Sequence, residues 1–206
     1  IAFVRDVVAE RGDDATWVVA VWHHSVYSAA FHSLEQDVVE RRAALAPAMS
    51  ELGVDLVLSG HDHIYTRSYL MDGTTPVGDR AAQEQTGVTL SAEEGQVLYV
   101  TGNSSSGSKY YDLDARSPEA AIKLQPRQPQ FTDVDVSPTA ITLTTRQIYD
   151  GTLIDQVTLT KAGADTTAPV LSGVPEVSEV SQGQPFEPLL GVAAVDDVDG
   201  DLSAQV

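Results

Sequence analysis

The stretch "TWVVAVWHH" (residues 16–24) and its counterpart "GVDLVLSGHDH" (residues 53–63) decide the fold. Each contains an apolar run rich in β-branched residues, and each ends in histidines. Apolar runs without polar alternation are typical of strands that are covered on both faces in a parallel sheet. The sequence therefore predicts two buried strands, each followed by a pair of imidazoles.

Residues 34–52, between these runs, predict a helix. Val38, Leu45 and Met49 follow one another at helical spacing and form an apolar stripe. Pro47 disturbs a helix interior, so we expect a kink there or a second helical piece that begins at Pro47. A strand, a helix and a strand in this order predict parallel strands.

The following segments extend this unit. Residues 71–95 are rich in Gly, Thr, Asp and Gln and predict a long surface excursion, and "QVLYVTG" (96–102) predicts another strand. The runs "FTDVDV", "AITLTTRQIY" and "LIDQVTLT", separated by turn-forming residues, predict an antiparallel meander. We place this α/β domain at residues 1–161.

A linker and a second domain complete the predicted organisation. The composition of "AGADTTAP" (162–169) is typical of a linker. Residues 170–206 contain short strand-like pieces between Gly and Pro residues, and they are too few for an independent core. We expect an incomplete all-β domain here.

Charge and composition limit the possible partners. Twelve Lys and Arg residues against 30 Asp and Glu residues give a net charge of −18, which disfavours binding of nucleic acid or an anionic membrane surface. No apolar stretch has the length of a transmembrane helix, and the chain begins with Ile1, so we expect a truncated start. Because there is no cysteine, any metal must be held by nitrogen and oxygen ligands.

The two histidine pairs favour a metal site. His23 and His24 follow one predicted strand, and His61 and His63 follow the other, so both pairs lie at the edge where open α/β sheets bind ligands. If residues 61–63 are extended, His61 and His63 share one face. Hydrogen-bonded loop histidines are the alternative, but two clusters at matching strand ends favour metal ligation.

These residues carry a family resemblance. "WVVAVWHHSVYSAAFH", followed by "GVDLVLSGHDHIYTRSY", resembles the purple acid phosphatase branch of the calcineurin-like metallophosphoesterases. The motifs of that branch read His-x-Pro-x-Tyr and Gly-His-x-His-x-Tyr-x-Arg. The resemblance implies that His23 and His61 bind one metal ion and that His63 binds another.

The resemblance also implies cofactors and further roles. It implies two metal ions, iron with zinc, manganese or a second iron, and the two-metal hydrolysis of a phosphorylated small molecule. His32 falls where plant-type enzymes keep a histidine that contacts the phosphate and protonates the leaving group. Arg67 is a candidate for substrate binding, with a structural ion pair as the equal alternative. His24 is expected to point away from the metals.

The sequence departs from the family pattern at two places. Ser25 replaces the proline of the first motif, which affects the stiffness of the loop. The earlier motifs of the family, which supply Asp, Asn and Tyr ligands, are not found before His23. The resemblance therefore covers the C-terminal half of a metallophosphoesterase sandwich, a βαβ unit with antiparallel strands, and we expect this chain alone to be inactive.

Residues 170–206 resemble the start of bacterial immunoglobulin-like modules. Gly183, Asp196, Asp199, Gly200 and Asp201 carry this likeness. Such modules imply an exported bacterial enzyme, secreted or on the cell surface, with possible cell-surface or matrix contact through the β module.

Two alternatives stay open. The parent could be a non-catalytic surface or adhesion protein with a decayed phosphatase fold. Within the enzyme class, phosphodiesters or nucleotides are the rival substrates to monoesters.

Overall fold

A computed structural model gives the fold of two separate units. It describes residues 1–12, 15–114, 116–163, 167–174, 182–183, 185, 189–197 and 200–205. The chain divides into a first unit, Ile1–Ala162, and a second unit, Gly163–Val206.

The first unit contains a mixed sheet whose main path runs in the order β1-β2-β7-β3-β8, with β4 and β5 attached beside β7. β1, β2 and β7 are parallel, and β3 and β4 are antiparallel to β7. The strands are β1 (Val19–His24), β2 (Leu56–Gly60), β3 (Tyr65–Ser68), β4 (Leu70–Asp72), β5 (Thr75–Val77), β7 (Gln96–Thr101) and β8 (Ala120–Leu124). The predicted parallel strand–helix–strand unit and the predicted strand at 96–102 are confirmed.

The predicted helix between β1 and β2 is present. It consists of a short 3-10 helix η2 (Phe31–Leu34) and of α2 (Gln36–Glu51), while α1 (Ala2–Arg11) precedes β1. α2 continues through Pro47 as one helix, so the alternative of two helical pieces was wrong. Ala46, Ala48 and Met49 are buried, and this packing on both sides of Pro47 stabilises the helix across the missing hydrogen bond.

A second sheet covers the other face of the first. It has the order β6-β11-β10-β9, with β6 (Val88–Ala92), β9 (Gln130–Val136), β10 (Ile141–Gln147) and β11 (Leu153–Lys161). β9, β10 and β11 form the predicted antiparallel meander. Residues 71–95 are not an irregular excursion, because they contain β5, β6 and the short helix α3 (Arg80–Gln83).

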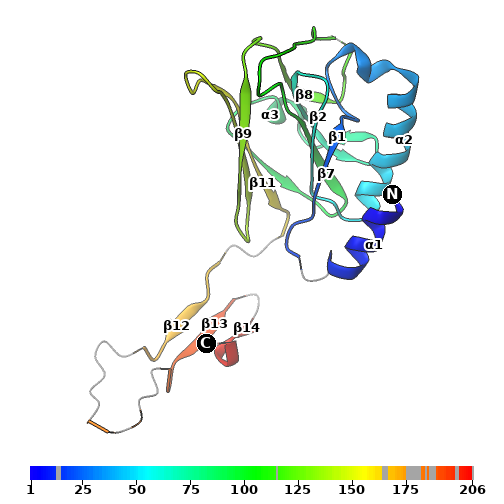
Figure 1. The fold of residues 1–206 in the computed structure, drawn as a ribbon. Coiled ribbons are helices and arrows are strands. Elements are labelled where there is room, and N and C mark those ends of the chain that lie inside the picture. The colour runs from blue at the N-terminus through cyan, green and yellow to red at the C-terminus, as the bar shows by residue number, and fades with distance from the viewer. Residues whose placement is uncertain are drawn as a thin grey trace. The chain divides into compact units, whose positions relative to one another are not determined.

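The first unit therefore has a layer of helices, a mixed sheet and a second sheet (Figure 1). Met49 of α2 packs with Val57 and Tyr99 in the core under the helices. Leu56 and Leu98, on the opposite face of the mixed sheet, pack with Ile141 and Leu159 of the second sheet. These two cores hold β2 and β7 rigidly between the layers.

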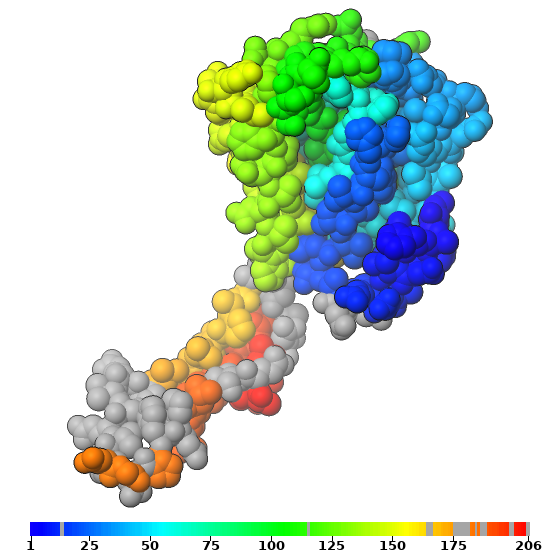
Figure 2. All heavy atoms as spheres, viewed as in Figure 1, coloured from blue at the N-terminus to red at the C-terminus, as the bar shows by residue number. Residues whose placement is uncertain are grey.

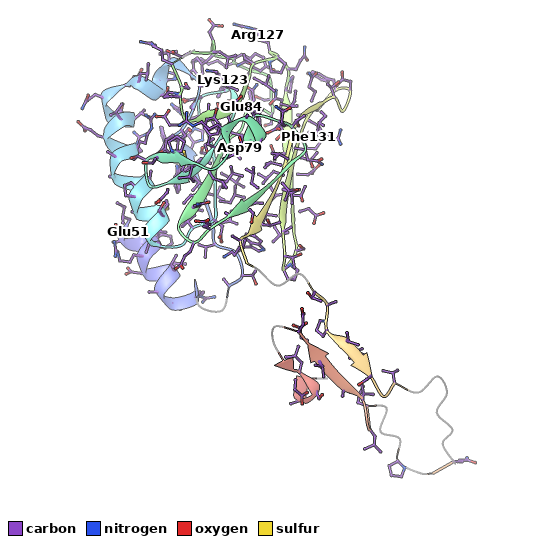
Figure 3. The ribbon with its side chains drawn as sticks, turned by 180° about the vertical axis from the view of Figure 1, so that it is seen from behind. Glu51, Asp79, Glu84, Lys123, Arg127 and Phe131 are labelled. Atoms are coloured by element: carbon purple, nitrogen blue, oxygen red, sulfur yellow. The ribbon has the colours of Figure 1, made fainter. Side chains whose placement is uncertain are left out.

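A buried ion pair joins the two sheets. The guanidinium of Arg67 on β3 donates from Nε to Asp155 Oδ2 on β11 at 2.6 Å, and both side chains are fully buried. Arg67 also donates to the carbonyls of Gln83 and Gln85, next to α3, whose ends are marked by Asp79 and Glu84 in Figure 3. The Tyr65 hydroxyl donates to the same carboxylate oxygen at 2.8 Å. Because all partners are hydrogen-bonded, this charge pair is compatible with burial.

The predicted strand "TWVVAVW" is less covered than its sequence implies. Val19 and Val21 on β1 are 38% and 73% exposed. By contrast, Leu56 and Val57 on β2 are buried. The expectation that both strands are covered on both faces holds for β2 and is wrong for β1.

The second unit contains a small antiparallel sheet of β12 (Val170–Ser172), β13 (Ala193–Asp196) and β14 (Gly200–Asp201), followed by a 3-10 helix η3 (Ser203–Gln205). Asp199, one of the residues that carry the immunoglobulin-like likeness, lies outside the described residues. An all-β character is thus visible in the described part, whereas the immunoglobulin-like assignment stays a prediction.

Across the described ranges, no helix is both long enough and apolar enough to cross a bilayer.

Removing one partner of the buried ion pair should destabilise the first unit. Asp155→Ala leaves the Arg67 charge buried and unpaired, so we expect the free energy of unfolding in urea to fall by about 3–5 kcal/mol. The control Asp133→Ala, at an exposed position of β9, should change it by less than about 0.5 kcal/mol. A loss of less than about 1 kcal/mol for Asp155→Ala would contradict a structural role for this pair.

Candidate functional site

Strand direction brings the histidines together. β1 and β2 are parallel neighbours in which His24 pairs with Gly60, so both strands end at the same rim of the sheet. His23 and His24 are the last residues of β1, and His61 follows directly after β2. β7 ends beside β2 at this rim, where Ser59 pairs with Thr101. The rim is the carboxyl edge of the parallel strands, as expected from the sequence.

The backbone turns sharply at His61. Its φ is +73°, and the Asp62 N–H donates to the Gly60 carbonyl at 2.9 Å, which closes a γ-turn with His61 at its centre. His63 also has a positive φ, +47°. Residues 61–63 are therefore not extended, and the expectation that His61 and His63 share a strand face was wrong. Such backbone strain in non-glycine residues is concentrated at functional sites.

The turn aims His61 at His23. His61 Nδ1 and His23 Nε2 lie 3.3 Å apart, and the two rings are nearly perpendicular. Two nitrogens bound at about 2.0–2.1 Å to one tetrahedral ion lie roughly 3.4 Å apart. The observed separation thus fits two ligands of a single ion, as well as a direct hydrogen bond between the rings.

His63 is oriented by the loop that follows β7. Its Nδ1 lies 2.8 Å from the Lys109 carbonyl oxygen. Because a carbonyl only accepts, Nδ1 carries a proton, and in the neutral ring Nε2 keeps its lone pair for a ligand. The Tyr111 ring lies 5.5 Å from His63 and 4.7 Å from His32. The loop of Lys109 and Tyr111 therefore closes one side of the histidine cluster.

His24 belongs to the cluster, contrary to expectation. Its ring centroid lies 4.3 Å from that of His61 and 5.3 Å from that of His23. The sequence predicted that His24 points away from the metals, because neighbouring residues of an extended strand point to opposite sides. The sequence held no signal for Lys109 and Tyr111 beyond their place in the loop after a strand that ends at the same rim.

His32 lies next to the histidine cluster, beside Asp62. His32 Nδ1 is 3.4 Å from Asp62 Oδ1, and Asp62 is buried, but the orientation makes no hydrogen bond. The His32 ring lies 5.9 Å from His61. The two histidines and Asp62 line a cavity of about 130 Å³ that also touches Glu35, Asp37 and Arg41. Three carboxylates outnumber the one guanidinium, which is paired with Asp37, so this cavity needs an added cation to attract a phosphate.

Arg67 does not match its candidate role in substrate binding. Its side chain is fully buried, and its donors are used by Asp155 and by the carbonyls of Gln83 and Gln85. This geometry is that of the alternative, a structural ion pair. The substrate-binding assignment of Arg67 is therefore not carried forward.

The other motif residues also support the fold. Tyr65 is buried and its hydroxyl donates to Asp155. Tyr27 is buried in the core under the helices, and this burial raises its pKa to about 12. Ser25, which replaces the motif's proline, places its hydroxyl 2.6 Å from the Tyr27 carbonyl and 2.6 Å from the Thr101 hydroxyl. These hydrogen bonds restrain the loop after β1 in place of a proline ring.

Electrostatics keep His61 available as a ligand. Partial burial lowers the pKa of His61 below its ordinary value of 6.5, and the charges of His24, His23 and His32 act in the same direction, while Asp62 opposes them. A neutral imidazole is the form that binds metal. His61 therefore offers a free lone pair at neutral pH.

Comparisons with known proteins find similarity to purple acid phosphatases. No protein-family model matches the chain. It is 31% identical over 112 residues to purple acid phosphatase 17 of Arabidopsis thaliana, covering 54% of this chain and 30% of that protein. It is 41% identical over 49 residues to purple acid phosphatase 7 of the same plant, covering 24% of this chain and 14% of that protein. The structure resembles a purple acid phosphatase from yellow lupin (Lupinus luteus) seeds, with a TM-score of 0.59, 15% identity, and coverage of 78% of this chain and 28% of that chain.

The fold of this chain thus resembles part of the fold of a purple acid phosphatase. In sequence, part of the chain is homologous to purple acid phosphatases. The chain spans less than a third of the length of the relatives that it matches. Among the described residues, no three His, Asp or Glu side chains form a group arranged to hold a metal ion.

The titration of His61 tests the electrostatic description. In the metal-free chain, NMR should give His61 a pKa below 6.5, and His24→Gln should raise it because a positive neighbour is lost. Between the lowered pKa and 6.5, the unfolded chain binds a proton that the folded chain does not, so falling pH through this window lowers stability. A pKa of His61 at or above 6.5 would contradict the described surroundings.

Proposed function

We propose that this chain carries the late histidine ligands of a two-metal phosphoesterase of the purple acid phosphatase type, which hydrolyses phosphate esters. The observation that carries the proposal is the approach of His23 Nε2 and His61 Nδ1 to 3.3 Å, in a chain that is partly homologous to purple acid phosphatases. Those enzymes use a binuclear metal centre.

The donors of this chain fit part of such a centre. His23 and His61 would hold one ion, and His63, through its free Nε2, would hold the other. When bound, the two ions would supply a nucleophile activated from water and neutralise the charge of the phosphoryl oxygens. Among the described residues, no group of three or more His, Asp or Glu side chains could hold a metal ion, so the proposal requires oxygen ligands from additional sequence.

The remaining residues have supporting roles in the proposal. The strained turn at His61 would hold the imidazole in the position of a metal ligand already in the metal-free chain. His32 would donate a proton or a hydrogen bond to the departing oxygen, with Asp62 beside its Nδ1. Tyr111, in contact with His32 and His63, would exclude water from one side.

Substrate and location are part of the same proposal. The acidic surface of the chain repels anions, so only local cations can attract a phosphate. A phosphorylated small molecule, which needs only such local attraction, is therefore the proposed substrate. Export to the medium or the cell surface, with the β unit in contact with surface or matrix, stays a proposal from the sequence. A non-catalytic binding protein with a decayed phosphatase fold is the alternative from another class, and diesters or nucleotides are the alternative substrates.

Activity measurements separate these possibilities. This chain alone, stripped of metal and reloaded with iron, zinc or manganese, should hydrolyse an aryl phosphate hardly faster than the metal solution. The longest protein translated from the gene that encodes these residues should hydrolyse the aryl phosphate. In that protein, His61→Ala should lower kcat/KM by at least about 100-fold because a ligand is lost.

The control is Glu51→Gln, which changes an exposed carboxylate at the end of α2 and should leave kcat/KM unchanged. Failure of the longer, metal-loaded protein to hydrolyse either mono- or bis-aryl phosphates would contradict the proposed function and favour the binding protein. Strong turnover by this chain alone would contradict the need for further ligands.

A further inference from the structure

Exposed apolar side chains border the histidine cluster. Phe31, at the start of η2, is 50% exposed, and Leu113, in the loop after β7, is 44% exposed. An isolated antiparallel bridge between Ala30 and Leu113 holds the two segments side by side. Both segments lie on the surface at the upper end of the first unit in Figure 2, the first in blue and the second in green. Together with the Tyr111 ring, Phe31 and Leu113 form what we call the apolar rim patch.

The apolar rim patch is in contact with His32. The ring centroids of Phe31 and Tyr111 lie 3.9 Å and 4.7 Å from that of His32. The Phe31 and Tyr111 rings are nearly perpendicular, with centroids 5.9 Å apart, which is the edge-to-face arrangement of packed aromatic rings. Because Nδ1 of His32 is buried beside Asp62, Nε2 is the ring nitrogen that can contact a ligand. A ligand that reaches His32 therefore has apolar side chains next to it.

The patch is held in place without a ligand. Tyr111 packs on the buried side chains of Ala30 and Ile64. The side-chain amide of Gln125 donates to the carbonyls of Tyr111 and His63 at 2.8 Å and 2.6 Å, which fixes the loop against the histidine turn. A surface that is already ordered loses little conformational freedom when a ligand binds. The patch is thus preorganised.

The charges around the patch already have partners. The ion pairs on either side of Leu113 are Asp112–Arg127 and Asp114–Arg116. The ammonium of Lys109 lies 4.4 Å from the centroid of the Tyr111 ring, in a cation–π contact. An additional charged group would have to compete with these contacts, whereas an apolar group would not. The surroundings therefore favour an uncharged, apolar ligand group at the patch.

We propose that the apolar rim patch binds the apolar part of a phosphate ester, so that the site prefers esters of aromatic or long-chain alcohols to sugar phosphates. This inference rests on the proposed function, in which His32 donates to the departing oxygen. The carbon skeleton attached to that oxygen then lies beside Phe31, since Phe31 and His32 are in ring contact. Its burial against Phe31 and Leu113 removes apolar surface from water.

Binding to this chain without metal tests the patch directly. In an NMR titration with naphthyl phosphate, the amide resonances of residues 29–34 and 111–114 should shift. The Kd should be at least about tenfold lower than that of inorganic phosphate, because the aromatic ring adds apolar contact. Phe31→Ser should remove this preference, and Phe31→Leu, which stays apolar, should keep most of it. The matched control is Phe131→Ser, at a phenylalanine of β9 that is 40% exposed, and it should keep the preference unchanged.

Three results would overturn the proposal. The first is equal affinity for naphthyl phosphate and inorganic phosphate, or equal affinity for naphthyl phosphate and glucose phosphate. The second is a preference for naphthyl phosphate that Phe31→Ser leaves unchanged. The third is a shift of the same resonances when the concentration of the chain rises without ligand, which would assign the patch to contact with a second copy.

Activity measurements separate the patch from the proposed function. Ethanol and hexanol have nearly the same acidity, so the ratio of kcat/KM for hexyl phosphate to that for ethyl phosphate reports apolar contact. In the longer, metal-loaded protein this ratio should be about ten and should fall to about one in Phe31→Ser. An active protein with a ratio near one before substitution would contradict the patch alone. Binding of naphthyl phosphate at the patch in a protein without hydrolase activity would support the binding site and contradict the proposed function.

Discussion

The parallel pairing of β1 with β2 is the constraint on which the site depends. The register that opposes His24 to Gly60 makes both strands end at one rim, so two histidine pairs separated by a whole helix in the sequence meet in space. The crossover through α2 enforces this direction, because parallel neighbours cannot be joined by a tight turn. With antiparallel pairing, the two pairs would lie at opposite ends of the sheet.

Several residues of the first unit stabilise that rim from outside the histidine cluster. The ion pair of Arg67 with Asp155 fastens β3, which follows the histidine turn, to the second sheet. Tyr65 adds a hydrogen bond to the same carboxylate, and Tyr27 fills the core beneath the loop after β1. The spacing of histidine, tyrosine and arginine in "GHDHIYTRSY" thus combines ligand candidates with residues that hold the turn in place.

Much of this arrangement could be predicted from the sequence, and the failures have physical causes. Long apolar runs and helical spacing indicated the parallel unit, and strand-like runs between turn-forming residues indicated the meander. Within residues 71–95, β5 has only three residues, and the alternating pattern of β6 is flanked by Gly, Thr and Glu residues that are typical of loops. The predicted direction of His24 was wrong because it assumed a regular strand end, and the turn at His61 arises from a backbone conformation that the residue type does not reveal. The burial of Arg67 could not be read from its motif, since its partner Asp155 is 88 positions away.

We propose that His23 and His61 are ligands of one ion. The zinc K-edge X-ray absorption spectrum of this chain with one equivalent of Zn²⁺ tests it most directly, with the His23→Gln, His61→Gln double variant as reference. We predict a shell of light atoms at about 2.0–2.1 Å with scattering from two imidazole rings, which the double variant loses. A spectrum without imidazole scattering, or one that is the same in both proteins, would contradict the claim.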